Sequence, residues 1–164
     1  MSVSLGAPVP LAVTHQLQGF SCGEPSLDDW LQRRALSNHL SGASRTFVVA
    51  DGDARVYGYY ALAAGAVSHQ LATGAVRRNM PEPIPALVLA RLAVDRRVQG
   101  ANLGAALLRD AAQRAALVAQ HTGVRALLVH ALHERAKAFY VHYGFKESPI
   151  QPMTLMAPIR RLIA

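Results

Sequence analysis

The stretch Leu89–Asp110, LARLAVDRRVQGANLGAALLRD, decides how the rest of the chain is interpreted. An apolar run ends at charged residues, a glycine-containing turn follows, and a pattern typical of an amphipathic helix begins. One apolar stripe of that helix is formed by Leu103, Leu107, Ala111, Ala115 and Val118. The stretch therefore predicts a strand, a turn and a helix that packs on a sheet.

The turn is a candidate site for an anion. The first turn of a helix exposes backbone N–H groups that have no partner inside the helix, and the helix dipole adds positive potential. Gly100 and Gly104 let the chain bend and let a ligand approach the backbone. These features favour a phosphate or pyrophosphate. The spacing matches neither a Rossmann G-x-G-x-x-G fingerprint nor a Walker A loop, and a plain turn without a ligand remains the alternative.

The other predicted elements place this turn in an α/β or α+β sheet with helices on its faces and ligands at the ends of the middle strands. Ser26 and Asp29 resemble a capping box that opens a helix. No repeat, low-complexity tract or long linker divides the chain, so we expect one domain over residues 1–164. The predicted strands are 8–15, 44–51, 55–67, 86–95, 125–132 and 153–158, and the predicted helices are 27–40, about 104–121 and 134–144.

The composition narrows the classes of partner and compartment. The formal net charge is +7, which permits a polyanionic partner such as nucleic acid, with a solvated basic surface as the alternative. Cys22 is the single cysteine, so no internal disulfide forms, which fits a reducing cytoplasm, and we interpret it as a structural thiol. No secretory signal or membrane span is predicted. His130 and His133 do not share a helical face and lack further ligands, so we expect no metal.

The turn also carries a family resemblance. QGANLG (99–104), placed after RLAVD, resembles the acetyl-CoA motif Gln/Arg-x-x-Gly-x-Gly/Ala of the GCN5-related N-acetyltransferases, or GNAT family. Asn102 replaces the middle glycine, and Asn is the residue other than Gly best suited to left-handed backbone angles. Further blocks, among them FSCGEPSLDDWL, RRNMPEPIP and AKAFYVHYGF, look like the toxin branch of that family. Members of that branch acetylate the amino group of aminoacyl-tRNA in toxin–antitoxin systems.

The resemblance implies a mixed central sheet, splayed at the acetyl-CoA site, with helices on both faces. It implies that the backbone of the strand before the turn pairs with the pantetheine arm, that the amides of the turn hold the pyrophosphate, and that two arginines contact phosphate. These cofactor-binding residues are Leu92, Ala93, Val94, Arg96, Arg97, Gln99, Gly100, Ala101, Asn102, Leu103, Gly104 and Ala105.

The resemblance further implies that Tyr140, in FYVHYGF, is the catalytic group, whereas Tyr143 does not match the pattern. A phenol near the thioester sulfur can donate a proton as the carbon–sulfur bond breaks. The alternative is that Tyr140 is only a half-buried aromatic residue of a helix. An α-amino group, with a pKa of about 7.7, is substantially neutral near pH 7 and needs no strong base. We therefore interpret Asp95 and Glu134 as structural.

The expected partners follow from charge and from the resemblance. Arg33, Arg34, Arg77, Arg78 and Lys137 are expected to contact tRNA phosphates. The toxin branch implies a ribbon-helix-helix antitoxin, a homodimer, and operator DNA contacted only through the antitoxin complex. Two other functions stay open: a GNAT acetyltransferase acting on a small-molecule or protein amine, and an inactive cofactor-binding module that acts through complexes.

Overall fold

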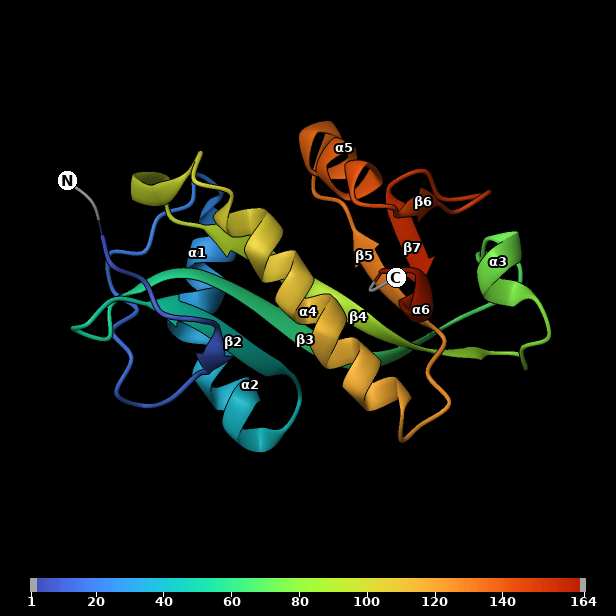
Figure 1. The fold of residues 1–164 in the computed structure, drawn as a ribbon, viewed down its shortest axis with the longest axis horizontal. Helices are drawn as coiled ribbons and strands as arrows, with labels where there is room; N and C mark the ends of the chain where they lie inside the picture. Colours follow the sequence, from blue (N-terminus) through green and yellow to red (C-terminus); the bar gives the residue numbers. More distant parts are fainter. Residues whose placement is uncertain (1–2, 163–164) are drawn as a thin grey trace. The chain divides into compact units, whose positions relative to one another are not determined.

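A computed structural model describes residues 3–162, which form a mixed seven-stranded sheet with helices (Figure 1). The strand order is β1-β2-β3-β4-β5-β7-β6. The pair β4–β5 is parallel, and the pairs β5–β7 and β7–β6 are antiparallel. The elements are β1 (Val9–Pro10), α1 (Pro25–Arg33), α2 (Ala35–Ser41), β2 (Arg45–Ala50), β3 (Val56–Val67), α3 (Gly74–Arg77), β4 (Ile84–Val94), η1 (Arg96–Val98), α4 (Leu103–Ala119), β5 (Ala126–His130), α5 (Glu134–His142), β6 (Lys146–Glu147), β7 (Thr154–Pro158) and α6 (Ile159–Leu162).

The described chain divides into two compact units, which we treat one at a time. Unit 1 holds residues 3–63 and 91–110, and unit 2 holds residues 64–90 and 111–162. Strands β3 and β4 and helix α4 each contribute residues to both units. No helix of the described residues is long and apolar enough to cross a membrane.

In unit 1, helices cover both faces of the β2–β3 hairpin. Neighbouring residues of a strand point to opposite faces. Tyr59 packs into a cluster with Leu31 and Ala35, which come from α1 and α2. On the other face, a Cβ built on Gly58 would lie 3.2 Å from side-chain carbons of both Leu103 and Leu107. The first two turns of α4 therefore pack directly on β3, which places the turn before α4 at the edge of a rigid core.

In unit 2, the parallel pair β4–β5 is registered from Ala86↔Ala126 to Val88↔Leu128. Among the described residues of this unit, the pairing stops there, although β5 continues to pair with β7 as far as His130. The two parallel strands separate after Val88, in agreement with the predicted splay. Below the separation, Ile84, Ala86 and Met156 belong to a fully buried cluster that holds β4, β5 and β7 together.

The sequence predicts the long elements well and the short ones poorly. The capping box at Ser26 is wrong, because α1 begins at Pro25 and its N-cap, Glu24, makes no side-chain cap hydrogen bond. Proline fixes φ near the helical value and lacks the N–H that a cap would satisfy, so it takes the first helical position. The single helix predicted over 27–40 is two helices, α1 and α2, joined at Arg34. The first strand shrinks to Val9–Pro10, and α3, β6 and α6 were not predicted.

Candidate functional site

The turn between η1 and α4 has the backbone that its sequence suggests. Gly100 has φ 89° and Asn102 has φ 60°, so both adopt left-handed angles. The prediction that Asn102 supports this conformation in place of glycine is confirmed. The carbonyl of Asn102 accepts a hydrogen bond from Ala106 N at 3.1 Å, which makes Asn102 the residue from which α4 starts.

The first amides of α4 are available to an anion. Among the described residues, the backbone N–H groups of Leu103, Gly104 and Ala105 make no hydrogen bond. The helix they open has 17 residues and carries no acidic residue in its first turn. Three unpaired donors at the positive end of a long helix form a seat for a phosphate or pyrophosphate. The residues present therefore fit the pyrophosphate of acetyl-CoA.

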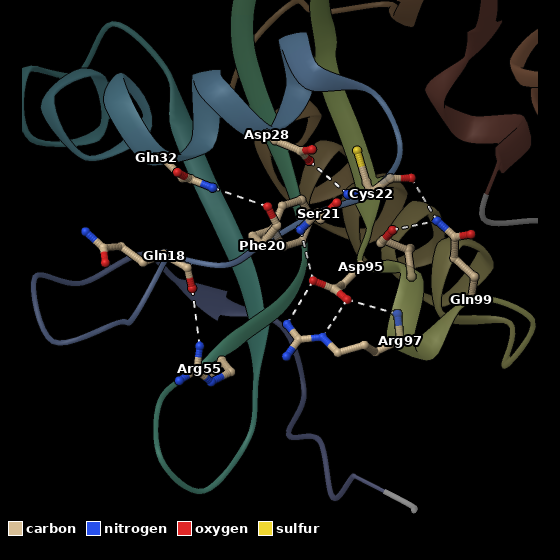
Figure 2. A network of polar contacts seen from close by, with 11 residues as sticks. Gln18, Phe20, Ser21, Cys22, Asp28, Gln32, Arg55, Asp95, Arg97 and Gln99 are labelled. Carbon is tan, nitrogen blue, oxygen red and sulfur yellow. Dashed lines mark hydrogen bonds and ion pairs between the residues drawn. The ribbon is translucent and has the colours of Figure 1, made fainter.

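A buried carboxylate holds the start of this turn. Asp95 is 1% exposed and accepts hydrogen bonds from Ser21 N at 3.0 Å, Arg97 N at 2.9 Å, and Arg97 Nε and Nη2 at 2.8 and 2.9 Å (Figure 2). Burial alone raises the pKa of Asp95, but the hydrogen bonds from Arg97 and Ser21 outweigh it, so the pKa lies below its ordinary value. Asp95 is therefore an ionised anchor of the turn, in agreement with the structural role predicted for it.

The Gln99 side chain is a second anchor. Its Nε2 donates to Val94 O at 2.9 Å and to Cys22 O at 3.0 Å, which connects the end of β4 to the segment before α1 (Figure 2). That segment is itself fixed, because Arg96 N donates to Ser21 O at 2.8 Å and Cys22 N donates to Asp28 Oδ1 at 2.9 Å. The side chain of Gln99 therefore fixes the start of the turn without using the backbone N–H groups of Leu103, Gly104 and Ala105.

Sequence reasoning missed the part played by Ser21 and Cys22. Both contribute backbone groups to the turn from more than 70 positions away, and backbone groups leave no signal in residue type. The thiol of Cys22 agrees with the structural interpretation, because burial and the hydrogen bond with Asp28 raise its pKa to about 12. A thiol that stays protonated is a poor nucleophile.

Unit 1 brings together all of the predicted cofactor residues. Leu92, Ala93 and Val94 end β4 immediately before the turn. The two arginines differ in how much of their charge is committed. The guanidinium of Arg97 pairs with Asp95 and lies 4.7 Å from the centre of the Tyr57 ring. Arg96 is exposed, lies beside Gly23 and has no ion-pair partner among the described residues, so its charge is less committed than that of Arg97.

Tyr140 lies on α5 in unit 2, in an aromatic cluster. Its ring packs edge-on against Phe139 and Phe145, with centroids 5.2 and 5.5 Å away, and the residue is 8% exposed. Burial raises the pKa of its phenol to about 12. The phenol is therefore protonated at neutral pH. Tyr143 is 41% exposed.

The basic residues predicted to contact tRNA occur in both units. Arg33 and Arg34 are exposed where α1 meets α2 in unit 1. In unit 2, Arg77 and Arg78 are exposed at the end of α3, and Arg77 Nη1 donates to His69 O at 3.3 Å. Lys137 pairs with Glu147 at 3.3 Å and its side chain is only 17% exposed, so part of its charge is neutralised.

Comparisons with known proteins identify the family. Residues 43–147 match the model of the acetyltransferase (GNAT) domain. A tRNA-acetylating toxin of Mycobacterium tuberculosis is 55% identical over 150 residues, which cover 92% of this chain and 90% of that protein. Among solved structures, AtaT complexed with acetyl-methionyl-tRNAfMet is 27% identical with a TM-score of 0.89 over 97% of each chain.

A second solved structure contains a cofactor and part of a partner. It is a tyrosine-to-phenylalanine mutant of the toxin AtaT bound to the C-terminus of the antitoxin AtaR and acetyl-CoA. It is 27% identical, has a TM-score of 0.83, and covers 96% of this chain and 95% of its own. With a family model that spans well over half of its length, this chain belongs to the GNAT acetyltransferase family.

Proposed function

We propose that this protein is a toxin-type N-acetyltransferase that moves an acetyl group from acetyl-CoA to the α-amino group of aminoacyl-tRNA. The observation that carries the proposal is the 55% identity, over 92% of the chain, to a tRNA-acetylating toxin. An acetylated amino group can no longer attack a peptidyl ester, so the product blocks translation.

Acetyl-CoA supplies the acetyl group as a thioester when it is bound. The residues of unit 1 supply the grip on it: the amides of Gln99–Ala105 receive the pyrophosphate, Arg96 adds a positive charge, and the backbone of Leu92–Val94 lies along the arm. Asp95 and Gln99 hold these groups in place before the ligand arrives. Such preorganisation lowers the free energy that binding would otherwise spend on ordering the turn.

Tyr140 is the proposed general acid. As the neutral substrate amine attacks the carbonyl and the carbon–sulfur bond breaks, the Oη proton passes to the departing sulfur, and the new amide nitrogen releases a proton that restores the phenol directly or through water. A thiolate, with a pKa of about 8.5 for the free thiol, is stabilised by a nearby proton donor. Because burial raises the pKa of Tyr140 to about 12, the phenol is protonated at neutral pH. No strong base is required, because an α-amine with a pKa of about 7.7 is already partly neutral at pH 7.

The same proposal covers partners and organisation. A ribbon-helix-helix antitoxin neutralises the enzyme, the pair contacts operator DNA through the antitoxin, and the free enzyme is a homodimer acting in the cytoplasm, where charged tRNA is found. The AtaT–AtaR complex bound to DNA supports the antitoxin part of this proposal. We also propose that residues 1–164 form one acetyltransferase domain, a proposal supported by a family match that runs through residues of both units.

The test incubates labelled acetyl-CoA with a charged total tRNA pool and compares the wild type with Tyr140→Phe. Tyr143→Phe is the matched control, because it removes the same hydroxyl from an exposed tyrosine of the same segment. We expect label in aminoacyl-tRNA with the wild type and the control, and a loss of about 10²–10⁴-fold in rate with Tyr140→Phe.

Other outcomes assign the protein differently. Equal labelling by all three proteins would keep the substrate and remove Tyr140 from the mechanism. Transfer only to free amines or peptides would identify a small-molecule or protein acetyltransferase. Binding of acetyl-CoA with no transfer to any amine would identify an inactive module.

A further inference from the structure

The positive charge of the chain is concentrated in unit 2. This unit contains nine of the 17 Lys and Arg residues and three of the ten Asp and Glu residues, so it carries +6 of the formal +7. Two of its three carboxylates are already engaged, because Glu82 lies beside His69 and Glu147 pairs with Lys137. The third, Glu134, occupies the first turn of α5. Its remaining cations have few carboxylates within the unit to neutralise them.

Unit 2 also contains a cavity of about 280 Å³ where the end of α4 meets α6. Its walls include carbon atoms of Ala116, Ala119, Val124 and Pro158, and two guanidinium side chains line it, those of Arg125 and Arg160. An apolar floor with cations beside it suits a ligand that combines an anionic group with a flat apolar one.

Arg125 is fixed in position but not electrically satisfied. Its backbone N donates to Pro85 O at 2.9 Å and its carbonyl accepts from Ile159 N at 3.0 Å. Its Nη2 donates to Ala75 O at 3.0 Å and to Arg78 O at 3.4 Å, whereas its Nε is buried without a partner. Within residues 3–162, the guanidinium of Arg125 therefore donates only to neutral carbonyl oxygens.

Three further arginines gather around Arg125. We name Arg78, Arg125, Arg160 and Arg161 the Arg125 cluster. Burial holds the pKa of Arg125 below its ordinary value, and the charges of Arg160, Arg161 and Arg78 lower the pKa further. Within residues 3–162, no carboxylate forms an ion pair with any member of the cluster. A guanidinium that is repelled by three others, with no carboxylate paired to it among the described residues, favours the arrival of an external anion.

We propose that this cavity and the Arg125 cluster bind a phosphodiester of the tRNA body, with a base or ribose against the apolar wall. The inference rests on the proposed function and adds a contact region beyond Tyr140 and the cofactor turn. RNA is favoured over an acidic peptide, because the Nη2 hydrogen bond to Arg78 O joins the cavity to the Arg77–Arg78 segment already expected to contact phosphates. Guanidinium groups bind phosphate oxygens in a bidentate manner.

The test measures the affinity of deacylated total tRNA by fluorescence anisotropy across a range of salt concentrations, so that catalysis plays no part. Arg160→Gln and Arg161→Gln each remove one charge from the cluster. Arg109→Gln is the matched control, because Arg109 is exposed, belongs to unit 1 and makes no ion pair within the described residues. Each phosphate contact contributes about 0.7–0.9 to the slope of log Kd against log salt concentration. Relative to 1 M salt, one contact therefore strengthens binding about five- to eightfold at 0.1 M salt.

We therefore expect each cluster variant to weaken tRNA binding by about five- to eightfold at 0.1 M salt and to lower the slope by about one contact. Arg109→Gln is expected to do neither. Ala119→Trp fills the cavity without changing charge, and we expect it to weaken tRNA binding with an unchanged salt slope. This variant separates occupation of the cavity from general electrostatic attraction.

A parallel arm replaces tRNA with a decaglutamate peptide. If Arg160→Gln, Arg161→Gln and Ala119→Trp bind the peptide more weakly than the wild type but bind tRNA equally well, the cavity is assigned to an acidic protein segment and the proposal is overturned. Cluster variants that bind tRNA no more weakly than Arg109→Gln would also overturn it, even if the wild type acetylates aminoacyl-tRNA normally. A wild type that neither binds nor acetylates tRNA would overturn the proposed function together with this inference.

Discussion

Replacing Asp95 with asparagine tests whether the buried carboxylate holds the cofactor turn. Asn has nearly the same shape, but one of its two terminal atoms is an amide nitrogen that cannot accept a hydrogen bond. In the wild type each carboxylate oxygen accepts one bond from a backbone N–H and one from the Arg97 guanidinium. Either orientation of the amide therefore loses two of the four bonds and turns N–H groups toward the donors.

The magnitude follows from those two bonds. Hydrogen bonds to charged groups contribute about 1.5–3 kcal/mol each. The lower end applies, because the Arg97 side chain is 48% exposed and can turn toward water. The variant is therefore expected to lose about 3 kcal/mol of unfolding free energy. For a chain of this size that corresponds to a fall of about 6–12 °C in Tm.

The assay combines thermal unfolding with the KM for acetyl-CoA, measured by release of free thiol. We expect Tm to fall and KM to rise, with a smaller effect on kcat, because the turn binds the cofactor and Tyr140 remains in place. Asp29→Asn is the control, since Asp29 is exposed on α1, and surface changes of this kind stay within about 0.5 kcal/mol. An unchanged Tm for Asp95→Asn would refute the anchoring role.

Acidification provides an independent check on the same residue. The folded-state pKa of Asp95 lies below its ordinary value, so the ionised carboxylate stabilises the fold above about pH 4, the unfolded value. That contribution is lost as the pH falls below 4 through the folded-state pKa. The stability gap between the wild type and Asp95→Asn should therefore narrow as the pH falls below about 4. A gap that stays constant would show that ionisation of Asp95 is unimportant.

Three further predictions follow from the geometry of single residues. Asn102→Ala should raise the KM for acetyl-CoA by about fivefold, because alanine at φ 60° costs about 1 kcal/mol. Asn102→Gly should leave KM unchanged, and equal KM values for the two variants would contradict the role of the left-handed turn. The rate of acetyl transfer should rise with pH through the α-amine pKa of about 7.7. Because burial raises the pKa of Tyr140 to about 12, loss of the Tyr140 proton should cause no fall in rate below pH 10; a fall between pH 8 and 10 that disappears in Tyr140→Phe would contradict this. Gly65→Ala should destabilise the fold by about 1–3 kcal/mol in urea unfolding, because the new Cβ would lie 2.7 Å from Val88 Cγ2, and adding Val88→Ala should recover most of the loss.

Patterns that repeat over many residues predicted the long elements. The stripe of α4 is correct at its centre, where Leu107, Ala111 and Ala115 are fully buried, and wrong at its end, where Val118 is 38% exposed. The strands predicted over 44–51, 55–67 and 86–95 also coincide closely with β2, β3 and β4. Short elements such as α3 and β6 were not predicted, because four or two residues are too few to show the hydrophobic periodicity of a helix or a strand.

The cofactor turn was predictable because its requirements are local. A left-handed angle, a helix start and the absence of acidic residues can all be read from residues 99–105. The network that anchors it was not predictable. Asp95 meets Ser21 across 74 positions, and Gln99 meets Cys22 across 77. Similarly, the Arg125 cluster gathers side chains from three separate segments, which only the folded chain brings together.

The left-handed angle at Asn102 restricts which residues evolution can place there. Two separate filters act on the position. The backbone filter passes glycine, asparagine and aspartate, the residues that tolerate φ near 60° at little cost. The charge filter removes aspartate, because a carboxylate beside the free amides of Leu103, Gly104 and Ala105 would repel a pyrophosphate and compete for those amides. Only glycine and asparagine meet both requirements, so a search pattern that allows only glycine at this position would overlook functional members of the family.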